Sequence, residues 1–302
     1  MKNLVQFLIA IATISILLLK VWFITGSSTG FGRILAEQLL AKGETVVATA
    51  RKPEQLEDLV SSYSDRALAV RLDVTKPEEV REAVKQAIAA FGRIDVLVNN
   101  AGFGTMGAVE EVTNAEVRQQ YETNVFGALD VMRAVLPQMR QQRSGYILNL
   151  SSVGGVVSFP GAGIYCSTKF ALEGISEAMA TEVAPLGIKI TLVEPGAFRT
   201  DFNGRSLVAT ENLISDYDEV IGGFREWVKN VDGKQPGDPA KAVAAMIQAV
   251  ESGNPPLRLP LGADAVSAIE TKLELVQADV DRSREVALDT AYEGVAVGAI
   301  GG

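Results

Sequence analysis

The spacing of apolar residues constrains the fold of this chain more than any other feature. Seven runs of four to six mostly apolar residues alternate with longer amphipathic segments. Strands that are apolar along their whole length are buried on both faces, as in parallel sheets covered by helices on each side. The alternation therefore predicts an α/β fold with one doubly wound parallel sheet of about seven strands. The runs span residues 21–24, 45–50, 67–72, 94–98, 146–150, 188–193 and 257–261.

Capping residues mark several helix starts between these runs. Thr75-Lys-Pro-Glu and Thr113-Asn-Ala-Glu each have the spacing of a capping box. Asp238 precedes a proline, which is an N-cap residue followed by proline at the first helical position. No repeat or linker divides the chain, so residues 20–302 are expected to form a single domain.

Two segments interrupt the alternation. Residues 196–237 contain no apolar run and end in a stretch rich in glycine and proline. They are expected to form a long insertion without a strand, and such insertions are often lids or binding loops. After about Asp289 the chain is rich in small residues and glycine, and this tail is expected to fray.

The N-terminal residues 1–19 form a segment of their own. Residues 4–19 are almost wholly apolar and are flanked by Lys2 and Lys20. Sixteen helical residues span about 24 Å, which is less than a hydrocarbon core of roughly 30 Å. We interpret the segment as an uncleaved helix that contacts a membrane, on a protein that is otherwise cytoplasmic. The alternatives are an extra helix packed on the domain and a product of an early start codon.

Charge and residue counts exclude several classes of function. The formal charge is −9, which argues against nucleic acid as the main partner because phosphate binding needs a basic surface. There is no histidine, and Cys166 is the only cysteine. Hydrolases that use a histidine base, metal sites with histidine ligands and intrachain disulfides are therefore excluded, and no metal site is predicted. Acid–base chemistry must come from Tyr, Lys, Asp, Glu or Ser.

A glycine-rich loop follows the first apolar run. It reads Thr25-Gly-Ser-Ser-Thr-Gly-Phe-Gly32 and leads into an amphipathic segment at residues 33–41. Glycines let the chain turn sharply, so that backbone N–H groups at a helix N-terminus can approach a pyrophosphate. A plain turn is the alternative, but the place between a buried strand and a helix favours a dinucleotide site.

Further motifs follow in a fixed order, and together they resemble the classical short-chain dehydrogenase/reductase family over about residues 20–262. The resemblance implies a Rossmann fold with strand order 3-2-1-4-5-6-7. The motifs are Gly-x3-Gly-x-Gly at residues 26–32, Asp73 in Leu-Asp-Val-Thr, Asn99-Asn-Ala-Gly102, Asn124 in Thr-Asn-Val-Phe-Gly, Ser151-Ser152, Tyr165-x3-Lys169, and Pro195-Gly196 with Thr200.

The resemblance also implies which residues bind a nicotinamide dinucleotide. They are Thr25, Gly26, Ser28, Thr29, Gly30, Phe31, Gly32, Arg51, Asp73, Val74, Asn100, Ala101, Gly102, Tyr165, Lys169, Pro195, Gly196, Phe198 and Thr200. NAD-binding folds usually place an acid at the end of the second strand, but here Ala50 and Arg51 stand there. Arginine can bind a 2′-phosphate bidentately, so NADP(H) is the expected cofactor. A solvated loop charge is the alternative for Arg51, and Thr29 stands where some NADP-preferring relatives have a basic residue.

By the same resemblance, four residues carry the chemistry. Tyr165 is the acid/base, Ser152 polarises the substrate oxygen, and Lys169 lowers the pKa of the tyrosine and holds the nicotinamide ribose. Asn124 organises a water path to the lysine. Tyr165 and Lys169 share one helix face over about residues 163–183. Structural alternatives are a turn cap for Ser152 and a core amide for Asn124.

Two further residues, Asn99 and Cys166, adjoin these motifs in the sequence. Asn99 either braces adjacent strands or touches substrate. Cys166 follows Tyr165 and is turned about 100° away on the helix, so no chemical role is assigned to it.

The expected substrate is a lipophilic alcohol or carbonyl compound, held in a pocket beneath the insertion. Residues available to line that pocket are Phe103, Met106, Val153, Phe159, Phe198 and Phe202. The motifs Ala-Thr-Ala-Arg51 and Val-Glu-Pro-Gly-Ala-Phe-Arg-Thr200 resemble the branch of 17β-hydroxysteroid and retinol dehydrogenases. A homodimer or homotetramer through helices at about residues 114–141 and 163–184 is also implied.

Two other classes of protein are alternatives to this interpretation. A non-catalytic NADP(H) sensor of the same fold would usually have a broken Ser/Tyr/Lys set, and the set here is intact. A sugar-nucleotide epimerase would carry Gly-x-x-Gly-x-x-Gly and a larger C-terminal domain, and both features are missing.

Overall fold

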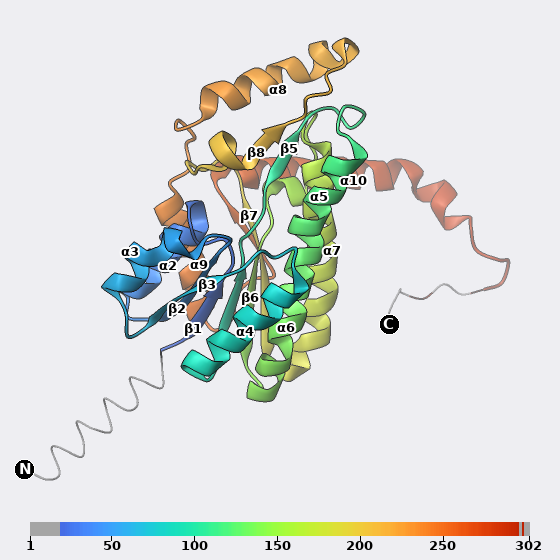
Figure 1. Ribbon diagram of the computed structural model, residues 1–302. Coiled ribbons are helices and arrows are strands. Elements are labelled where there is room, and N and C mark those ends of the chain that lie inside the picture. Colours follow the sequence, from blue (N-terminus) through green and yellow to red (C-terminus); the bar gives the residue numbers. More distant parts are fainter. Residues whose placement is uncertain (1–18, 296–297, 299–302) are drawn as a thin grey trace, which may run out of the picture.

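The computed structural model describes residues 19–295 and residue 298 (Figure 1). Its main sheet has seven strands in the order β3-β2-β1-β4-β6-β7-β9, and every pair of neighbours is parallel. This confirms the predicted fold class and strand order, because β5 and β8 belong to a separate small sheet. The strands of the main sheet are β1 (Val21–Ile24), β2 (Thr45–Ala50), β3 (Ala67–Arg71), β4 (Val96–Asn99), β6 (Gly145–Leu150), β7 (Ile188–Pro195) and β9 (Arg258–Leu261).

Helices cover both faces of this sheet. The α-helices are α2 (Gly30–Ala41), α3 (Glu57–Ser62), α4 (Pro77–Phe91), α5 (Asn114–Tyr121), α6 (Ala128–Gln142), α7 (Gly163–Val183), α8 (Asp218–Val231), α9 (Pro239–Glu251) and α10 (Ala263–Leu288).

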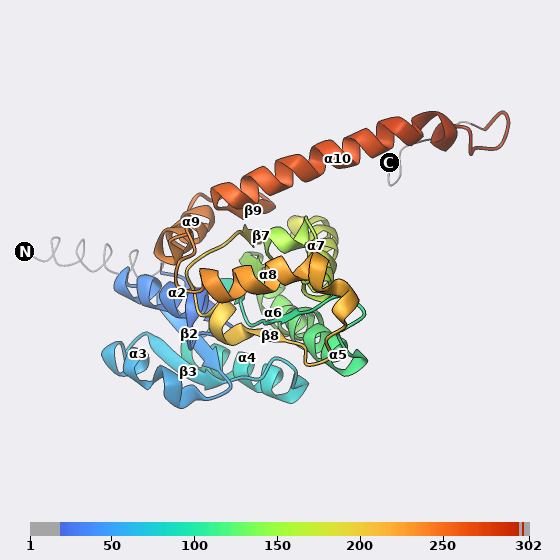
Figure 2. The same cartoon turned by 90° about the horizontal axis from the view of Figure 1, so that it is seen from above.

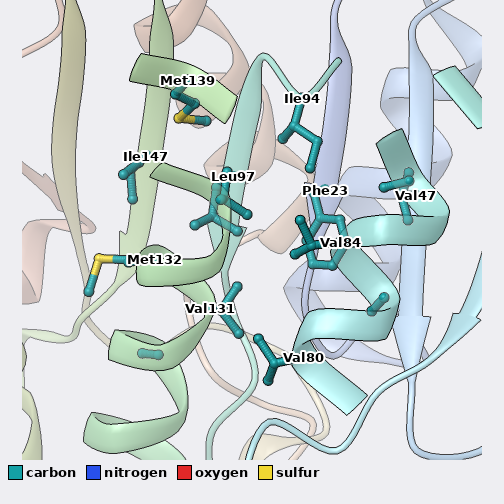
Figure 3. Packing of buried hydrophobic residues seen from close by; sticks show 14 of the residues in the cluster. Phe23, Val47, Val80, Val84, Ile94, Leu97, Val131, Met132, Met139 and Ile147 are labelled. Carbon is teal, nitrogen blue, oxygen red and sulfur yellow. The ribbon is translucent and has the colours of Figure 1, made fainter. Parts of the chain in front are cut away.

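Two apolar clusters hold the layers together. On one face, side chains of α4, α6 and α7 pack against the strands, for example Val84 and Met139 around Phe23 and Leu97 (Figure 3). On the other face, α2 and α9 pack on the same strands through a second cluster. Each fully buried side chain of this size contributes roughly 1.5–3 kcal/mol, so the sheet is the most stable part of the molecule.

One predicted capping box is confirmed and one is wrong. Thr113 caps α5 and exchanges hydrogen bonds with Glu116 in a full capping box. Helix α4 instead begins at Pro77 with Lys76 as its N-cap. Proline disfavours the helical conformation in the residue before it, so Lys76 is extended and the helix cannot begin there. Asp238 caps α9 as predicted, accepting from the N–H groups two and three residues on.

The insertion at 196–237 contains a strand, contrary to the expectation. Strand β8 (Leu207–Ala209) pairs in parallel with β5 (Gly104–Met106), which follows β4. Its three residues, although apolar, are too few to give a periodic signal. Strand β8 and helix α8 form a lid over one end of the main sheet (Figure 1).

A buried ion pair fastens this lid, residues 196–237, to the body of the protein. The Glu111 carboxylate accepts from the Arg225 guanidinium at 2.6 and 2.7 Å and from the Ile214 N–H at 2.9 Å. Burial alone would raise the pKa of Glu111, but these donors bring its pKa below the ordinary value. The carboxylate is therefore charged at neutral pH, and its ion pair holds α8 together with the buried side chains of Ile221 and Val228.

The C-terminal helix α10 was not predicted. It starts beside β9 and then leaves the body of the protein as a long arm (Figure 2). The predicted membrane-contacting helix at 4–19 lies almost wholly outside the described residues, and so does much of the tail expected to fray. Within the described part of the chain, no helix is both long and apolar enough to cross a bilayer.

Candidate active site

The glycine loop between β1 and α2 forms a cradle that side chains would fill. Gly26 and Gly30 have φ values of 68° and 57°, which L-residues rarely adopt. A Cβ atom at Gly32 would collide with the Gly26 carbonyl oxygen and lie 2.5 Å from the Asn100 side chain. The first turn of α2 holds no acidic residue. Its exposed N–H groups and positive dipole end are therefore open to an anion.

Residues after β4 hold this loop in place. The Thr25 hydroxyl oxygen accepts from the N–H groups of Asn100 and Ala101 at 2.9 and 3.0 Å. In return the Asn100 side chain donates to the carbonyl oxygens of Thr25 and Gly26 at 2.9 and 2.8 Å. The loop is thus set by the carboxyl ends of two neighbouring strands, where open α/β sheets bind ligands. Ser28 is half-buried in the same loop.

The ends of β2 and β3 place the next predicted residues. Arg51 is exposed just after β2, and within residues 19–295 its side chain has no hydrogen bond or ion pair. The Asp73 carboxylate accepts from the N–H and hydroxyl of Thr75 at 3.0 and 2.7 Å. Val74 is buried and lies against Gly127. This edge of the site therefore offers the unpaired Arg51 beside a fixed turn.

The lid reaches the glycine loop from the opposite side. The rings of Phe198 and Phe31 meet edge to face at 5.6 Å, and Thr200 lies 3.9 Å from the position of a Cβ added to Gly30. The Arg205 guanidinium donates to the Thr29 hydroxyl oxygen at 2.8 Å. Arg205 was missed by sequence reasoning, because nothing in its own segment indicates that it reaches a loop 176 residues away. Pro195 ends β7, and the Gly196 N–H donates to Leu261 at 2.9 Å.

Ser152 and Tyr165 lie on either side of one glycine at the carboxyl end of β6. A Cβ atom at Gly154 would be 3.3 Å from both the Ser152 hydroxyl oxygen and the Tyr165 ring. Ser152 also accepts from the Gly154 N–H at 3.0 Å and caps a single 3₁₀ turn at Val153–Gly155. Ser152 therefore caps a turn, as one alternative held, and it also lies beside the tyrosine.

Lys169 and Asn124 lie on either side of Gly102. A Cβ atom there would be 3.1 Å from the Asn124 amide oxygen and 3.8 Å from the Lys169 ammonium. Lys169 is buried, donates to the Leu150 carbonyl at 2.6 Å and sits 5.8 Å from the centre of the Tyr165 ring. Asn124 bonds the backbone of Phe103 through both ends of its amide and also donates to Thr168. A stretch of π-helix at Glu122–Gly127 carries Asn124, and such bulges often occur at functional sites.

Burial sets the proton affinities of the tyrosine and the lysine. It raises the pKa of Tyr165 to about 12, although the Ser152 side chain opposes this rise. It lowers the pKa of Lys169 to about 8. We expected the lysine to lower the tyrosine pKa. In the structure the ammonium is directed to Leu150 instead, so loss of hydration outweighs its attraction for a tyrosinate.

Two neighbouring residues serve the scaffold. The Asn99 side chain donates to Asn149 at 2.9 Å, and the two residues are register partners on β4 and β6. Asn99 thus braces adjacent strands, as one of its two alternatives predicted. Cys166 is buried with its sulfur 3.2 Å from the position of a Cβ added to Gly154, and burial raises the pKa of its thiol. A protonated, inaccessible thiol fits the absence of a chemical role.

An open pocket of about 670 Å³ lies between the lid and the body of the protein. Of the predicted lining residues, Phe159 borders this pocket, while Phe202 packs on the Tyr165 ring at 5.6 Å and Phe198 packs on the glycine loop. Met106 is buried in β5. The residues lining the pocket are Ala108, Val109, Glu110, Ser158, Phe159, Pro160, Gly161, Gly163, Tyr217 and Ile221.

The strand order and the glycine cradle define a Rossmann-type α/β protein. A family model described as short chain dehydrogenase matches residues 20–210, which is more than half of the chain. The chain is 42% identical over 273 residues to the oxidoreductase BOA17 of Botryotinia fuckeliana, covering 90% of this chain and 99% of that protein. It is also 42% identical over 245 residues to the 3-ketodihydrosphingosine reductase of Bacteroides thetaiotaomicron, covering 80% and 88%. The chain belongs to the short-chain dehydrogenase family and is an oxidoreductase.

Solved structures agree with this family. A short-chain dehydrogenase from Streptomyces avermitilis is 47% identical, with a TM-score of 0.86, over 91% of this chain and 100% of that one. A Burkholderia cenocepacia short chain dehydrogenase in complex with NADP is 28% identical, with a TM-score of 0.68, over 87% and 97%. A Burkholderia phymatum enzyme in complex with NAD is 22% identical, with a TM-score of 0.76, over 86% and 95%, and it shows the shared fold alone.

Proposed function

We propose that the protein is an NADP(H)-dependent oxidoreductase that interconverts a lipophilic alcohol and its ketone or aldehyde. The observation that carries this proposal is the position of Ser152, Tyr165 and Lys169 at the carboxyl end of β6. Ser152 and Tyr165 lie beside Gly154 and Lys169 beside Gly102, on the edge of the sheet that also holds the glycine loop. A dinucleotide and a proton donor can therefore meet at one reacting carbon.

A dinucleotide fits the residues of this edge. The cradle at Gly26, Gly30 and Gly32 leaves room for a pyrophosphate, and α2 presents its N-terminus to it. The other residues implied by the family resemblance surround this cradle. When bound, the nicotinamide donates or accepts the hydride.

Two arginines supply the positive charge that NADP(H) requires. Arg51 is exposed and unpaired where a 2′-phosphate-binding residue is expected, directly after β2. Arg205 of the lid touches Thr29, the position at which some relatives have their own basic residue. In the part of the chain that the structure describes, Arg205 has no acidic partner. We assign both guanidinium groups to cofactor phosphates, since arginine binds phosphate oxygens bidentately.

Tyr165 moves the proton. With a pKa of about 12 before cofactor binds, its hydroxyl is protonated at neutral pH and can donate to a carbonyl oxygen as the carbon is reduced. Ser152 donates a hydrogen bond to the same oxygen and withdraws charge from it. In the oxidative direction the tyrosine must first lose its proton, so we expect alcohol oxidation to rise with pH.

Lys169 and Asn124 support the tyrosine. The buried ammonium lies within reach of the ribose side of the site and favours tyrosinate when it is charged. Asn124 is tied to Phe103 and Thr168 and keeps the segment at Gly102 in place. From there it can hold a water beside the lysine, which is the role that the family resemblance implies.

The pocket favours an apolar substrate. Its walls include Val109, Phe159, Pro160 and Ile221, and the Glu110 carboxylate on its rim already accepts from the Tyr217 hydroxyl at 2.5 Å. A relative with 42% identity is named for the reduction of a keto compound, which supports a carbonyl substrate. Exposed Phe126 and Phe170, on the helical segments at 114–142 and 163–183, support the expected homo-oligomer.

The test is turnover of a panel of ketones, quinones, retinal and keto-steroids with NADPH and with NADH, with cofactor affinity measured separately. We expect one class of apolar ketone to be reduced, faster with NADPH. Tight NADPH binding without turnover of any carbonyl compound would contradict the proposal and favour a sensor of the same fold.

A further inference from the structure

The arm formed by α10 has no partner within the described residues of its own chain. Only its first turns touch the body: Ala265 is buried, and the Asp264 carboxylate accepts from the Ala197 N–H at 2.7 Å. Every residue from Leu273 to Leu288 is exposed, and this part of the helix extends away from the body of the protein (Figure 2). Isolated helices of this length are marginal in water, and most helices in proteins are stabilised by packing. The arm therefore needs a partner to remain helical.

One face of α10 carries the pattern of a coiled-coil seam. Val266, Ile269, Leu273, Val276 and Val280 follow one another at spacings of three, four, three and four residues. Spacings that alternate between three and four residues place the side chains in one stripe that a second helix can cover. Leu273 is 61% exposed, Val276 44% and Val280 47%, so the stripe is uncovered in the single chain.

The charges of α10 disfavour a membrane as its partner. The helix carries six acidic and three basic residues, whereas helices that bind anionic lipid surfaces are rich in lysine and arginine. A protein partner with a matching stripe remains, and the chain itself provides one.

We propose that α10 pairs antiparallel with α10 of a second copy of this chain. Placing Leu273 opposite Val276 of the partner subunit also places Ile269 opposite Val280 and Val266 opposite Ser283, each layer occurring twice by symmetry. In that register Lys272 lies beside Asp279 of the partner subunit, again twice. Lys272 has no ion pair within the described residues, and Asp279 has only the exposed Arg282, one turn away on its own helix.

The antiparallel direction also fits the shape of the molecule. The paired segment, from 266 to 283, is about 27 Å long. The body of each copy then lies at the opposite end of the seam, where the partner's helix is free of its own body. A parallel pair would bring the two bodies to the same end. Because the seam is short, we expect a reversible association rather than a permanent one.

The test compares two leucines on the full-length protein by sedimentation velocity at several concentrations. Leu273 and Leu275 are 61% and 60% exposed but point to different sides of the helix. We expect Leu273→Glu to raise the dissociation constant of one association step about 100-fold or more, because one leucine leaves each of two buried layers. Leu275→Glu should leave that step unchanged. An unchanged mass for Leu273→Glu, or equal effects of the two variants, would overturn the proposal.

A charge exchange tests the direction of the pair. Lys272→Asp faces Asp279 of the partner subunit only in the antiparallel register, so it should weaken association. The double variant Lys272→Asp/Asp279→Lys should restore it. Weakening by Lys272→Asp that the second change does not repair would overturn the antiparallel pairing. NADPH affinity, measured alongside, should stay unchanged in all four variants, because α10 carries no residue of the cofactor site.

Discussion

The two sides of the active site are built in different ways. The cofactor side consists of strand ends and tight turns that are joined to the core, with Thr25 and Asn100 tying β1 to β4. The lid side is joined to the body by a three-residue pairing of β5 with β8 and by the Glu111–Arg225 ion pair. Backbone hydrogen bonds inside an apolar core open rarely, whereas segments with few buried apolar contacts open readily. The cofactor side is therefore the fixed part of the site, and the lid is the part that can move.

This difference gives the cofactor side and the lid side separate roles. A fixed platform keeps the reacting groups in position, which is where most of the catalytic benefit of pre-organisation arises. A lid fastened by charge can admit substrates of different shape and close over them. Changes on the cofactor side should therefore act on binding of the dinucleotide and on chemistry, while changes in the lid should act on access.

The largest effect is expected at Gly32. In Gly32→Ala the new methyl group collides with the Gly26 carbonyl and crowds Asn100, so the cradle must open. Two lost charge-assisted hydrogen bonds to phosphate would weaken NADPH binding about 100-fold or more, measured by fluorescence titration. Gly174→Ala, in the open middle of α7, is the matched control and should raise stability by up to about 1 kcal/mol. Equal NADPH affinity in the two variants would argue against the cradle.

Lys169→Met should lower activity and raise the stability of the fold. The folded-state pKa of Lys169 is about 8, below its ordinary value of 10.5, so the buried charge destabilises the fold fully below pH 8. Stability of the wild type rises from about pH 8 to 10.5, where the unfolded chain binds more protons. The variant should be more stable by about 1–3 kcal/mol at pH 7, and its advantage should shrink above pH 8. Denaturant unfolding across this pH range measures the difference in stability between the variant and the wild type. For the exposed Lys241→Met this difference should not change with pH.

Arg51→Ala tests the cofactor preference. Loss of one guanidinium–phosphate contact should weaken NADPH binding about tenfold and leave NADH binding nearly unchanged. The neighbouring exposed Lys52→Ala should change the NADPH-to-NADH ratio much less. If Arg51→Ala lowered affinity for both cofactors equally, the assignment of Arg51 to the 2′-phosphate would be wrong.

The smallest effect is expected from loosening the lid. Arg225→Met leaves the Glu111 carboxylate buried without its cation, so the lid should open more often. Limited proteolysis should cleave residues 196–237 roughly tenfold faster, while the sheet stays intact. Arg118→Met on α5 is the control, and similar cleavage rates in the two variants would show that the ion pair does not fasten the lid.

The same difference between the cofactor side and the lid side explains which elements could be predicted from the sequence. Strand β1 is short and wholly apolar, and β4 is apolar except for Asn99 at its end, because both strands are buried on both faces, so their composition reveals them. The lid has no such signal. Strand β8 pairs with β5, and α8 forms a long-range ion pair in addition to burying Ile221 and Val228. The pairing and the ion pair each join residues about 100 positions apart. Arg205 belongs to the same class of contact.

Helix α10 and the pKa of Tyr165 escaped prediction for related reasons. The seam of α10 has a heptad pattern, but the helix lies beyond residue 262, where the family resemblance ends, and its exposed part packs on no strand or helix of the described chain. For Tyr165, motif spacing places a lysine one turn away but does not say where its ammonium points. The Leu150 carbonyl decides that direction.

Tyr165 is the proposed proton donor, and a comparison of two tyrosines tests this role. Tyr165→Phe and Tyr146→Phe each remove one hydroxyl, and the Tyr146 hydroxyl is buried without a hydrogen-bond partner in the described part of the chain. With the best carbonyl substrate, kcat and the NADPH dissociation constant should be measured for both variants. We predict that Tyr165→Phe lowers kcat by about 10²–10⁴ with NADPH affinity within about twofold, and that Tyr146→Phe changes neither. Wild-type turnover in Tyr165→Phe would contradict the mechanism.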